Sequence, residues 1–418
     1  MFNIKNKITK DKKISKILKK EKIRQENQVT LIASENYVSN AVLSAQGSIF
    51  TNKYAEGKIK NRYYAGCKYV DKIEKIAIER AKRLFCVKYV NVQPHSGTQA
   101  NFAAYSSVLK YGDTILGMDL SHGGHLTHGS DVNFSGKLYN FIHYKTNKKG
   151  EIDYSNIRKL AKKHKPKMIV GGFSSYSGDC NWKKMRKISN EINAFLLVDI
   201  SHIAGLIIAG LYNNPIPYAH IITSTTHKTL SGPRGGIILS NHDDKNLFKK
   251  IDSSVFPGCQ GGPLVHVMLA KAIAFKEAYG QKFKNYQIQV IKNVKAMIKI
   301  FKKENFKIVS NGSKNHLFLL DLRKNNVTGK EIEERLYRAN IVVNKNNIPD
   351  DDKKPSITSG IRIGTPAITR RGFLERESQK IAKWIIQIIK EKDNLNTILN
   401  IKNKVYKMCK LFPIYKNK

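Results

Sequence analysis

Short apolar runs alternate with helical patterns between residues 70 and 240. Val70, Ile73, Ala77 and Leu84 recur at helical spacing, and Tyr89–Val92 then has the pattern of a strand. A second helical pattern covers Thr98–Leu109, and further strand-like runs follow at Thr114–Met118, Met168–Val170, Phe195–Val198, Ile221–Thr223 and Ile237–Leu239. Strands that are apolar on both faces and separated by helices predict an α/β fold with a mostly parallel sheet flanked by helices.

The pattern changes after about residue 275, where long helical stretches such as Tyr286–Lys302 replace the regular alternation. Strand-like runs are fewer and farther apart there, at Leu317–Asp321 and Ile341–Val343. A chain of this length favours two domains. We expect residues 1–275 to form an N-terminal arm and a large domain, and residues 276–418 to form a smaller α+β domain.

An apolar stripe near the C-terminus has two interpretations. Ile381, Trp384, Ile385, Ile388 and Ile389 follow the spacing of one helix face, with basic residues on either side. Such a helix can lie on a membrane surface, but packing against the small domain is the simpler prediction. No apolar run approaches the roughly 20 residues that a membrane span needs, so we expect no membrane association.

The charge balance is unusual for a globular protein. The 418 residues include 74 Lys and Arg against 32 Asp and Glu, which gives a formal net charge of +42. This charge alone would suit a basic RNA-binding protein. However, lysines recur from Lys5 to Lys410, whereas a dedicated site concentrates basic residues on one element. We therefore interpret most of them as solvated surface residues and expect no specific nucleic acid partner.

The cysteines indicate a reducing environment. Cys67, Cys86, Cys180, Cys259 and Cys409 form no Cys-x-x-Cys pair and show no metal-ligand spacing. The N-terminal segment lacks the continuous apolar core of a secretion signal. A cytoplasmic protein with no metal site is expected.

One lysine stands in a segment dense in hydroxyl groups, Ser224–Gly236, directly after the apolar run Ile221–Thr223. Lys228 would emerge at the edge of the sheet where ligands of open α/β proteins bind. Such surroundings tune a lysine to act as a nucleophilic amine, which favours a Schiff base with a carbonyl cofactor. A polar turn with an incidental lysine is the alternative interpretation.

An acidic residue, Asp199, ends the preceding apolar run. A buried carboxylate needs a partner, because leaving it unpaired is costly. Pyridoxal phosphate offers one, since a carboxylate keeps its pyridine nitrogen protonated while a lysine holds its aldehyde as an imine. A helix N-cap is the alternative for Asp199. The order strand, Asp, strand, Lys favours the cofactor site.

A third segment joins a predicted strand to a predicted helix and contains Ser96, Gly97 and Thr98. Hydroxyl groups and a glycine at a helix N-terminus form a cradle for an anion, because the free N–H groups and the helix dipole both favour a phosphate. An ordinary helix cap without a ligand is the alternative. The segment falls on the same predicted sheet edge as Asp199 and Lys228.

Together with other motifs, these segments resemble the serine hydroxymethyltransferases, a pyridoxal phosphate family of the aspartate aminotransferase fold. The resemblance extends over nearly the whole chain. The additional motifs are Leu31–Asn36, Asn52–Gly57, Arg62–Tyr64, Phe256–Gly258, Gln260–Pro263 and Thr358–Pro366. The implied fold is a fold-type I transferase, with a mostly parallel mixed sheet and a smaller α+β C-terminal domain.

The resemblance also implies roles for individual residues. Lys228 would bind pyridoxal 5'-phosphate covalently, Asp199 would pair with the ring nitrogen, and His125 would stack on the ring. The other implied cofactor contacts are Ser96, Gly97, Thr98, Ser174, His202 and, from the neighbouring subunit, Gly262. His122 and His128 are instead expected to be hydrogen-bonded structural histidines.

Arg362 would bind the substrate carboxylate, since its planar fork can contact both oxygens. The resemblance gives Ser34, Tyr64 and His202 as further substrate contacts. Tyr54 and Glu56 would form an acid/base pair supplied by the other subunit, which implies a homodimer with shared active sites. The implied folate contacts are Glu56, Leu120, Gly124, His125, Leu126 and Asn346.

The implied reaction is the reversible transfer of the serine hydroxymethyl carbon to tetrahydrofolate, giving glycine and 5,10-methylenetetrahydrofolate through a pyridoxal phosphate external aldimine. A threonine aldolase, which cleaves β-hydroxy amino acids without folate on the same scaffold, is the nearest alternative. The chain departs from the family pattern at Lys58–Asn61, in a loop that is expected to border the folate entrance.

Overall fold

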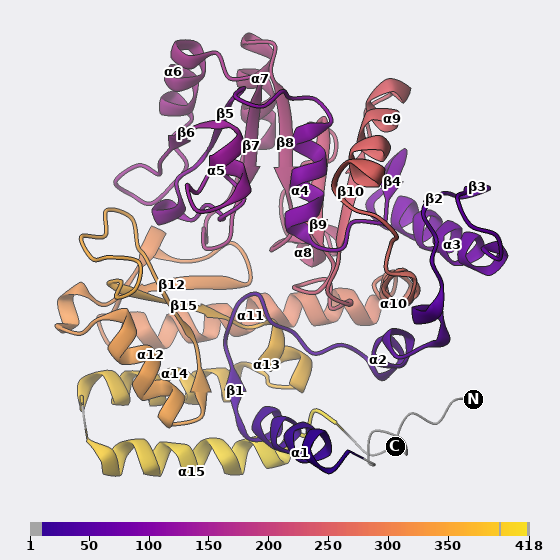
Figure 1. The fold of residues 1–418 in the computed structure, drawn as a ribbon. Helices are drawn as coiled ribbons and strands as arrows, with labels where there is room; N and C mark the ends of the chain where they lie inside the picture. The colour runs from indigo at the N-terminus through magenta and orange to yellow at the C-terminus, as the bar shows by residue number, and fades with distance from the viewer. Residues whose placement is uncertain (1–10, 393, 416–418) are drawn as a thin grey trace.

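The computed structural model describes residues 11–392 and 394–415. A seven-stranded sheet forms the centre of the large domain (Figure 1). Its strands, in spatial order, are β4 (Tyr89–Asn91), β10 (Gly236–Ser240), β9 (Ile221–Thr225), β8 (Phe195–Asp199), β7 (Met168–Gly172), β5 (Thr114–Met118) and β6 (Asn140–Tyr144). Only β10 runs antiparallel to its neighbours among these pairs. The predicted mostly parallel mixed sheet is confirmed.

Alternate residues of each central strand enter different cores, which explains the continuous apolar runs. Leu197, Ile221 and Ile238 pack on one face, with residues of the helices α4 and α9. Leu196 and Ile222 pack on the other face. The sequence pattern did not reveal β6, because this edge strand is mostly half-buried and its apolar run is short.

Helices cover both faces of this sheet. Val70 and Ala77 are buried on α3, as their spacing predicted. The longer helices of the large domain are α3 (Lys68–Phe85), α4 (Gly97–Ser106), α6 (Tyr154–His164), α7 (Trp182–Glu191), α9 (Lys245–Ser253) and α10 (Val265–Glu277). The shorter helical segments are α5 (Phe134–Leu138), α8 (Ala204–Ile208), η4 (Leu120–His122) and the π-helix η5 (Ser254–Cys259).

The C-terminal part contains a four-stranded antiparallel sheet with its own apolar core. The strands are β11 (Lys307–Ile308), β12 (Leu317–Asp321), β15 (Gly360–Gly364) and β14 (Asn344–Asn346). The helices are α11 (Gln281–Lys303), α12 (Gly329–Arg338), α13 (Pro366–Arg371), α14 (Glu375–Lys390) and α15 (Leu395–Leu411), with short turns at η6 (Val309–Asn311) and η7 (Arg323–Asn325).

The apolar stripe of α14 packs into this core, where Ile381, Ile385 and Ile389 are buried and Trp384 is partly buried. This confirms the prediction of packing against the small domain. Within the described residues, no helix combines the length and the apolar character that crossing a membrane requires.

The N-terminal arm contacts both domains (Figure 1). After α1 (Lys12–Asn27), β1 (Val29–Thr30) pairs in parallel with β13 (Ile341–Val342), and Val29 lies in the core of the small domain. Further along, α2 (Asn40–Gln46) packs on α10. The arm ends in η3 (Ile49–Asn52) and a hairpin of β2 (Gly57–Lys58) and β3 (Asn61–Arg62). The division at residue 275 stays a prediction.

Candidate active site

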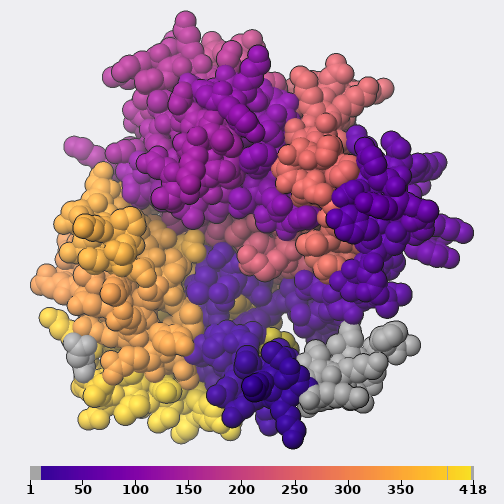
Figure 2. All heavy atoms as spheres, in the orientation of Figure 1, coloured from indigo at the N-terminus to yellow at the C-terminus, as the bar shows by residue number. Residues whose placement is uncertain are grey.

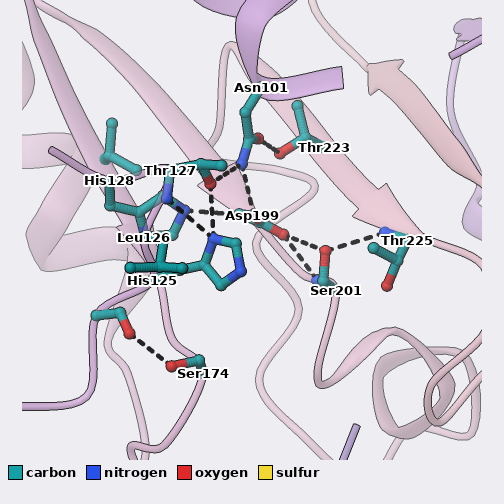
Figure 3. Close-up of polar contacts among 12 residues, drawn as sticks. Asn101, His125, Leu126, Thr127, His128, Ser174, Asp199, Ser201, Thr223 and Thr225 are labelled. Carbon is teal, nitrogen blue, oxygen red and sulfur yellow. Dashed lines mark hydrogen bonds and ion pairs between the residues drawn. The ribbon is translucent and has the colours of Figure 1, made fainter. Parts of the chain in front are cut away.

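Asp199 ends β8 at the carboxyl edge of the sheet and is buried. Its carboxylate accepts hydrogen bonds from the Ser201 N–H at 3.0 Å, the Ser201 hydroxyl at 2.5 Å and Asn101 Nδ2 at 2.9 Å (Figure 3). His128 Nε2 lies 3.3 Å away. Burial alone would raise the pKa of Asp199, but hydrogen bonding to His128 and its charge hold that pKa well below the usual range. The carboxylate is therefore ionised.

A chain of hydrogen bonds connects Asp199 to His125 (Figure 3). Asn101 Nδ2 also donates to Thr127 Oγ1 at 2.8 Å, and its own amide oxygen accepts from Thr223 Oγ1 at 2.6 Å. Thr127 Oγ1 lies 2.7 Å from His125 Nδ1, which also accepts from the Thr127 N–H at 3.2 Å. Nδ1 is therefore the acceptor nitrogen, and the ring proton is assigned to Nε2. Burial and the charge of His128 lower the pKa of His125 to about 4, so the ring is neutral.

Lys228 lies in the loop between β9 and β10 and is buried. Its ammonium donates to Thr225 Oγ1 at 3.0 Å, and its backbone carbonyl accepts from Asn36 Nδ2 at 2.9 Å. Burial lowers the pKa of Lys228 to about 8, although the charge of Asp199 acts in the opposite direction. About a tenth of this amine is therefore unprotonated at pH 7, far more than for an ordinary lysine.

The anion cradle predicted at Ser96, Gly97 and Thr98 forms the N-terminus of α4. Ser96 caps the helix, because its hydroxyl accepts from the Gln99 N–H at 3.2 Å. Gly97 is required by close packing, since a Cβ there would lie 2.6 Å from Thr225 Cγ2. The N–H groups of Gly97 and Thr98, at the start of the first turn, have no acceptor within the helix and can bind an anion.

These groups share one cavity of about 140 Å³. The predicted residues on its wall are Ser96, Gly97, Thr98, His125, Asp199, His202 and Lys228, and the others are Asn101, His128, Phe173, Ser201, Thr225, His227 and Arg234. An ionised acid, a buried amine and a helix N-terminus thus converge on one space, as the sequence predicted.

The sequence model of the family "Serine hydroxymethyltransferase" matches residues 8–385 of the chain. The chain is 62% identical to a serine hydroxymethyltransferase of Buchnera aphidicola subsp. Baizongia pistaciae over 406 residues, which is 97% of each chain. It is 61% identical to that of Wigglesworthia glossinidia brevipalpis over 407 residues, again 97% of each chain. The chain belongs to the serine hydroxymethyltransferase family. Its fold is therefore that of the fold-type I pyridoxal phosphate enzymes.

The residues around the cavity fit the cofactor of this family. Asp199 supplies an ionised partner for a protonated ring nitrogen, and Lys228 supplies an amine whose pKa is already lowered. The N-terminus of α4 suits a phosphate, and Gly97 lets that helix end pack closely against Thr225. The ring nitrogen, the aldehyde and the phosphate of pyridoxal phosphate thus each have a matching group in the chain.

His202 is buried on the cavity wall, and its Nδ1 lies 3.2 Å from Nε2 of His316. The two rings are stacked, and burial lowers the pKa of both. Ser174, the other residue expected at the cofactor's 3-hydroxyl group, donates its hydroxyl proton to the Gly124 carbonyl at 2.5 Å. It therefore does not line the cavity in this structure.

Arg362, the residue expected to bind the substrate carboxylate, lies on β15 and is only 9% exposed. Its Nη1 donates to the Ser174 carbonyl at 2.7 Å and its Nε to Asn344 Oδ1 at 3.1 Å. Burial lowers the pKa of Arg362 to about 10, so the group is still charged near neutral pH. The guanidinium is thus fixed by two polar contacts from different segments.

Ser34, predicted as a substrate contact, lines a second cavity of about 460 Å³. The two cavities are neighbours, because His227 and Arg234 line both of them. Burial and then the charge of Lys228 lower the pKa of His227 to about 3. Sequence reasoning gave neither His227 nor Arg234 a role, although both fall within the quoted segment Ser224–Gly236.

Four predicted residues gather elsewhere on the chain. The rings of Tyr54 and Tyr64 pack edge to face with centroids 5.3 Å apart, and both side chains are about half exposed. A Cβ at Gly262 would lie 3.2 Å from the Tyr54 ring, and one at Gly261 would lie 3.2 Å from Glu56 Oε1. Tyr54, Glu56, Tyr64 and Gly262 do not line the Lys228 cavity of their own chain.

Arg62 holds the segment that carries Glu56. Its Nη1 donates to the Ala55 carbonyl at 3.0 Å and the Gly57 carbonyl at 2.8 Å, which are the two neighbours of Glu56. Its other nitrogens pair with Asp71 at 2.9 Å and with Glu74. The unusual loop residue Lys58 adds an ion pair to Asp252 at 3.1 Å.

Of the predicted folate contacts, His125 lines the Lys228 cavity, whereas Leu120, Gly124, Leu126 and Asn346 do not. Leu120 and Leu126 are about 45% exposed. Gly124 packs tightly, since a Cβ there would lie 2.2 Å from the Met118 carbonyl oxygen. Asn346 is half-buried at the end of β14 and donates to the Asn347 carbonyl at 2.7 Å.

The structure adds residues that the sequence did not indicate. His122 and His128 are both buried and hydrogen-bonded, as expected, with His122 Nδ1 2.8 Å from Thr146 Oγ1. His128 also contacts Asp199 and lines the cavity. Sequence reasoning gave no role to Asn101, Thr127 or His316. The one signal that could have indicated them is a polar residue within an apolar, buried segment.

Proposed function

We propose that the chain transfers the hydroxymethyl carbon of serine to tetrahydrofolate, giving glycine and 5,10-methylenetetrahydrofolate, with pyridoxal phosphate bound covalently by Lys228. Membership of the family supports the reaction. The observation that carries the residue assignment is the convergence of Asp199, Lys228 and the N-terminus of α4 on one cavity. Exposed basic residues have no part in this arrangement, which argues against the RNA-binding alternative.

When bound, the cofactor supplies an electron sink for the pair left on the α-carbon after the bond to the β-carbon breaks. Asp199 keeps the proton on the ring nitrogen, because its own pKa is too low to remove it. Ser96, Gly97 and Thr98 hold the phosphate. His125 stacks on the ring as a neutral imidazole, with its Nε2 proton available to a neighbouring oxygen.

Arg362 binds the carboxylate of serine with the guanidinium hydrogens that Ser174 and Asn344 leave free. His202 lies beside the substrate amine, and its contact with His316 fixes the ring. We assign Ser34 to the same substrate from the adjoining cavity. These contacts would hold the substituents of the serine α-carbon in one orientation while the bound cofactor supplies the electron sink.

A homodimer with shared active sites completes the assembly. Tyr54, Glu56, Tyr64 and Gly262 cluster outside the cavity of their own chain, and two of their side chains are exposed rings. α1, which lies in indigo at the surface in Figure 2, also has three exposed apolar side chains, Ile14, Ile17 and Leu18. A second copy would cover these rings and bring the Tyr54 cluster into its own site.

We assign tetrahydrofolate to Leu120, Gly124, Leu126 and Asn346, with Glu56 and Tyr54 of the second subunit acting as acid and base.

We assign the protein to the cytoplasm. All five cysteines are free thiols, and a reducing compartment keeps them so.

The decisive experiment measures glycine formation from serine with and without tetrahydrofolate, together with the visible absorbance of the protein-bound cofactor. We expect glycine formation to rise strongly when folate is added. Lys228→Ala should lose both the reaction and the covalent absorbance, whereas Lys249→Ala, an exposed lysine on α9, should retain both. Cleavage at an equal rate without folate would instead identify an aldolase, and tight RNA binding without a cofactor would identify the RNA-binding class.

A further inference from the structure

One fully buried lysine has no role in the reaction described above. Lys271 lies on α10 and is 1% exposed. Its ammonium donates to three backbone carbonyls, those of Val92 at 2.7 Å, Gly236 at 2.8 Å and Pro94 at 3.0 Å. No carboxylate of the described chain forms an ion pair with it, and burial lowers the pKa of Lys271 to about 7, with Glu74 opposing this only at longer range. The three carbonyl acceptors match the three N–H groups of the protonated form. A buried cation is costly unless its hydrogen bonds are satisfied, and here backbone oxygens alone satisfy them.

The three carbonyls belong to the two segments that form the phosphate cradle. Val92 and Pro94 lie four and two residues before Ser96, and Gly236 begins β10 after the Lys228 loop. The segments touch each other, because the Gly236 N–H donates to the Pro94 carbonyl at 3.0 Å. A Cβ at Gly236 would lie 2.2 Å from the Ser96 carbonyl oxygen. Lys271 therefore joins both strands of the cradle through a single charged group.

Two further observations connect this ammonium to the cradle. Gly235 leaves room for it, since a Cβ there would lie 2.5 Å from Lys271 Cε. Burial and then the charge of Lys271 lower the pKa of His95, which stands directly before Ser96. The positive charge thus acts at the residue next to the cradle, although the lysine itself faces backbone.

We propose that Lys271 is a positioning residue for the cofactor phosphate. It fixes the backbone of residues 92–97 so that the N-terminus of α4 presents its N–H groups correctly, and its charge favours a dianion in the cradle. The inference rests on the proposed binding of pyridoxal phosphate. It predicts a role specific to the phosphate rather than to the ring or the aldehyde.

The test removes the cofactor from the full-length protein and titrates it back, comparing pyridoxal phosphate with pyridoxal, which lacks the phosphate. Lys271→Met keeps the length of the side chain and removes the charge. We expect the affinity for pyridoxal phosphate to fall by about tenfold, because a charged hydrogen-bonding group is lost. The affinity for pyridoxal should stay within about twofold of wild type, since the ring and amine contacts are intact. A changed ³¹P resonance of the bound phosphate would accompany the loss.

Lys276→Met, an exposed lysine on the same helix, serves as the matched control and should bind both compounds as wild type does. If Lys271→Met does not fold, Gly235→Ala is the second variant. Its added Cβ displaces the ammonium without removing it, and its affinity for pyridoxal phosphate alone should fall. Equal losses for both compounds, or no loss for either, would overturn the inference. Wild-type protein that binds neither compound would overturn the proposed function instead.

Discussion

Single residues determine the chemistry that the site can perform, and Lys228 is the clearest case. Its free amine, not its ammonium, reacts with a carbonyl group. At pH 8 an ordinary lysine with a pKa of 10.5 is only ~0.3% unprotonated, whereas one with a pKa of about 8 is about half unprotonated. Burial therefore converts this residue into a nucleophile under physiological conditions.

This gives a prediction for the pH dependence of cofactor attachment. The rate at which protein freed of cofactor reacts with pyridoxal phosphate should rise with pH as the ammonium loses its proton, and should level off above a pKa of about 8. Stopped-flow absorbance across pH 6–10 measures it, with a small-molecule amine as the reference. A rate that continues to rise up to pH 10 would show that Lys228 has an ordinary pKa.

The sequence allowed Lys228 and Asp199 to be placed because each follows a long buried strand. Their position at the sheet edge depends only on the parallel topology. Asn101 and Thr127 could not be assigned in this way, because their roles depend on which side chains the fold brings together. Lys271 could not be placed for the same reason, since its partners are backbone atoms about 35 and 180 residues away.

At the scale of elements, long buried strands were predictable and short ones were not. The runs at Phe195–Val198 and Ile221–Thr223 became β8 and β9 almost without change. β2, β3 and β14 have few apolar residues and are partly exposed, so no periodicity marks them. The β2–β3 hairpin instead depends on the side chain of Arg62, which anchors it to α3.

Removing that anchor should destabilise the protein. The Arg62 and Glu74 side chains are about 4–5% exposed, so breaking their pair leaves one charge buried without its partner. We expect Arg62→Met to lower the free energy of unfolding by ~3–5 kcal/mol. Urea denaturation would measure the loss, with Arg83→Met on the exposed side of α3 as a control that changes stability by less than about 0.5 kcal/mol.

The double variant Arg62→Met/Glu74→Met provides the decisive comparison for this pair. With both charges absent, only the partly exposed Asp71 loses its Arg62 partner and no fully buried charge is left unpaired, so the double variant should lose less stability than the two single losses added together. Losses that simply add would mean that Arg62 and Glu74 stabilise the hairpin independently.

At the scale of the whole molecule, the residues proposed for the site lie in two places that one chain does not bring together. The Lys228 cavity lies in the large domain, whereas Tyr54, Glu56 and Gly262 gather around the end of the N-terminal arm. The net charge of +42 is distributed over the chain and is not concentrated at either place. Repulsion between two such chains makes the apolar contacts of α1 and the exposed tyrosines more important for assembly.

Sharing of sites predicts recovery of activity when two inactive variants are mixed. Lys228→Ala and Glu56→Gln should each be inactive alone, but a mixed dimer contains one site with both native residues. After exchange of subunits, about a quarter of wild-type activity should return, because about half of the dimers are mixed and each has one intact site. Sedimentation confirms that dimers form, and a mixture that stays inactive would place both residues in the same chain's site.

The order of strands in the large sheet has a consequence for synthesis on the ribosome. β4 leads into the phosphate cradle, yet its partner in the sheet is β10, which begins about 145 residues later. Contacts this distant in sequence form slowly and only after the intervening chain is available. An emerging chain that has not yet produced β10 therefore exposes the edge of β4 and has no functional cradle. The reactive aldehyde of the cofactor can thus be bound only late in translation, once the strands that protect it are in place.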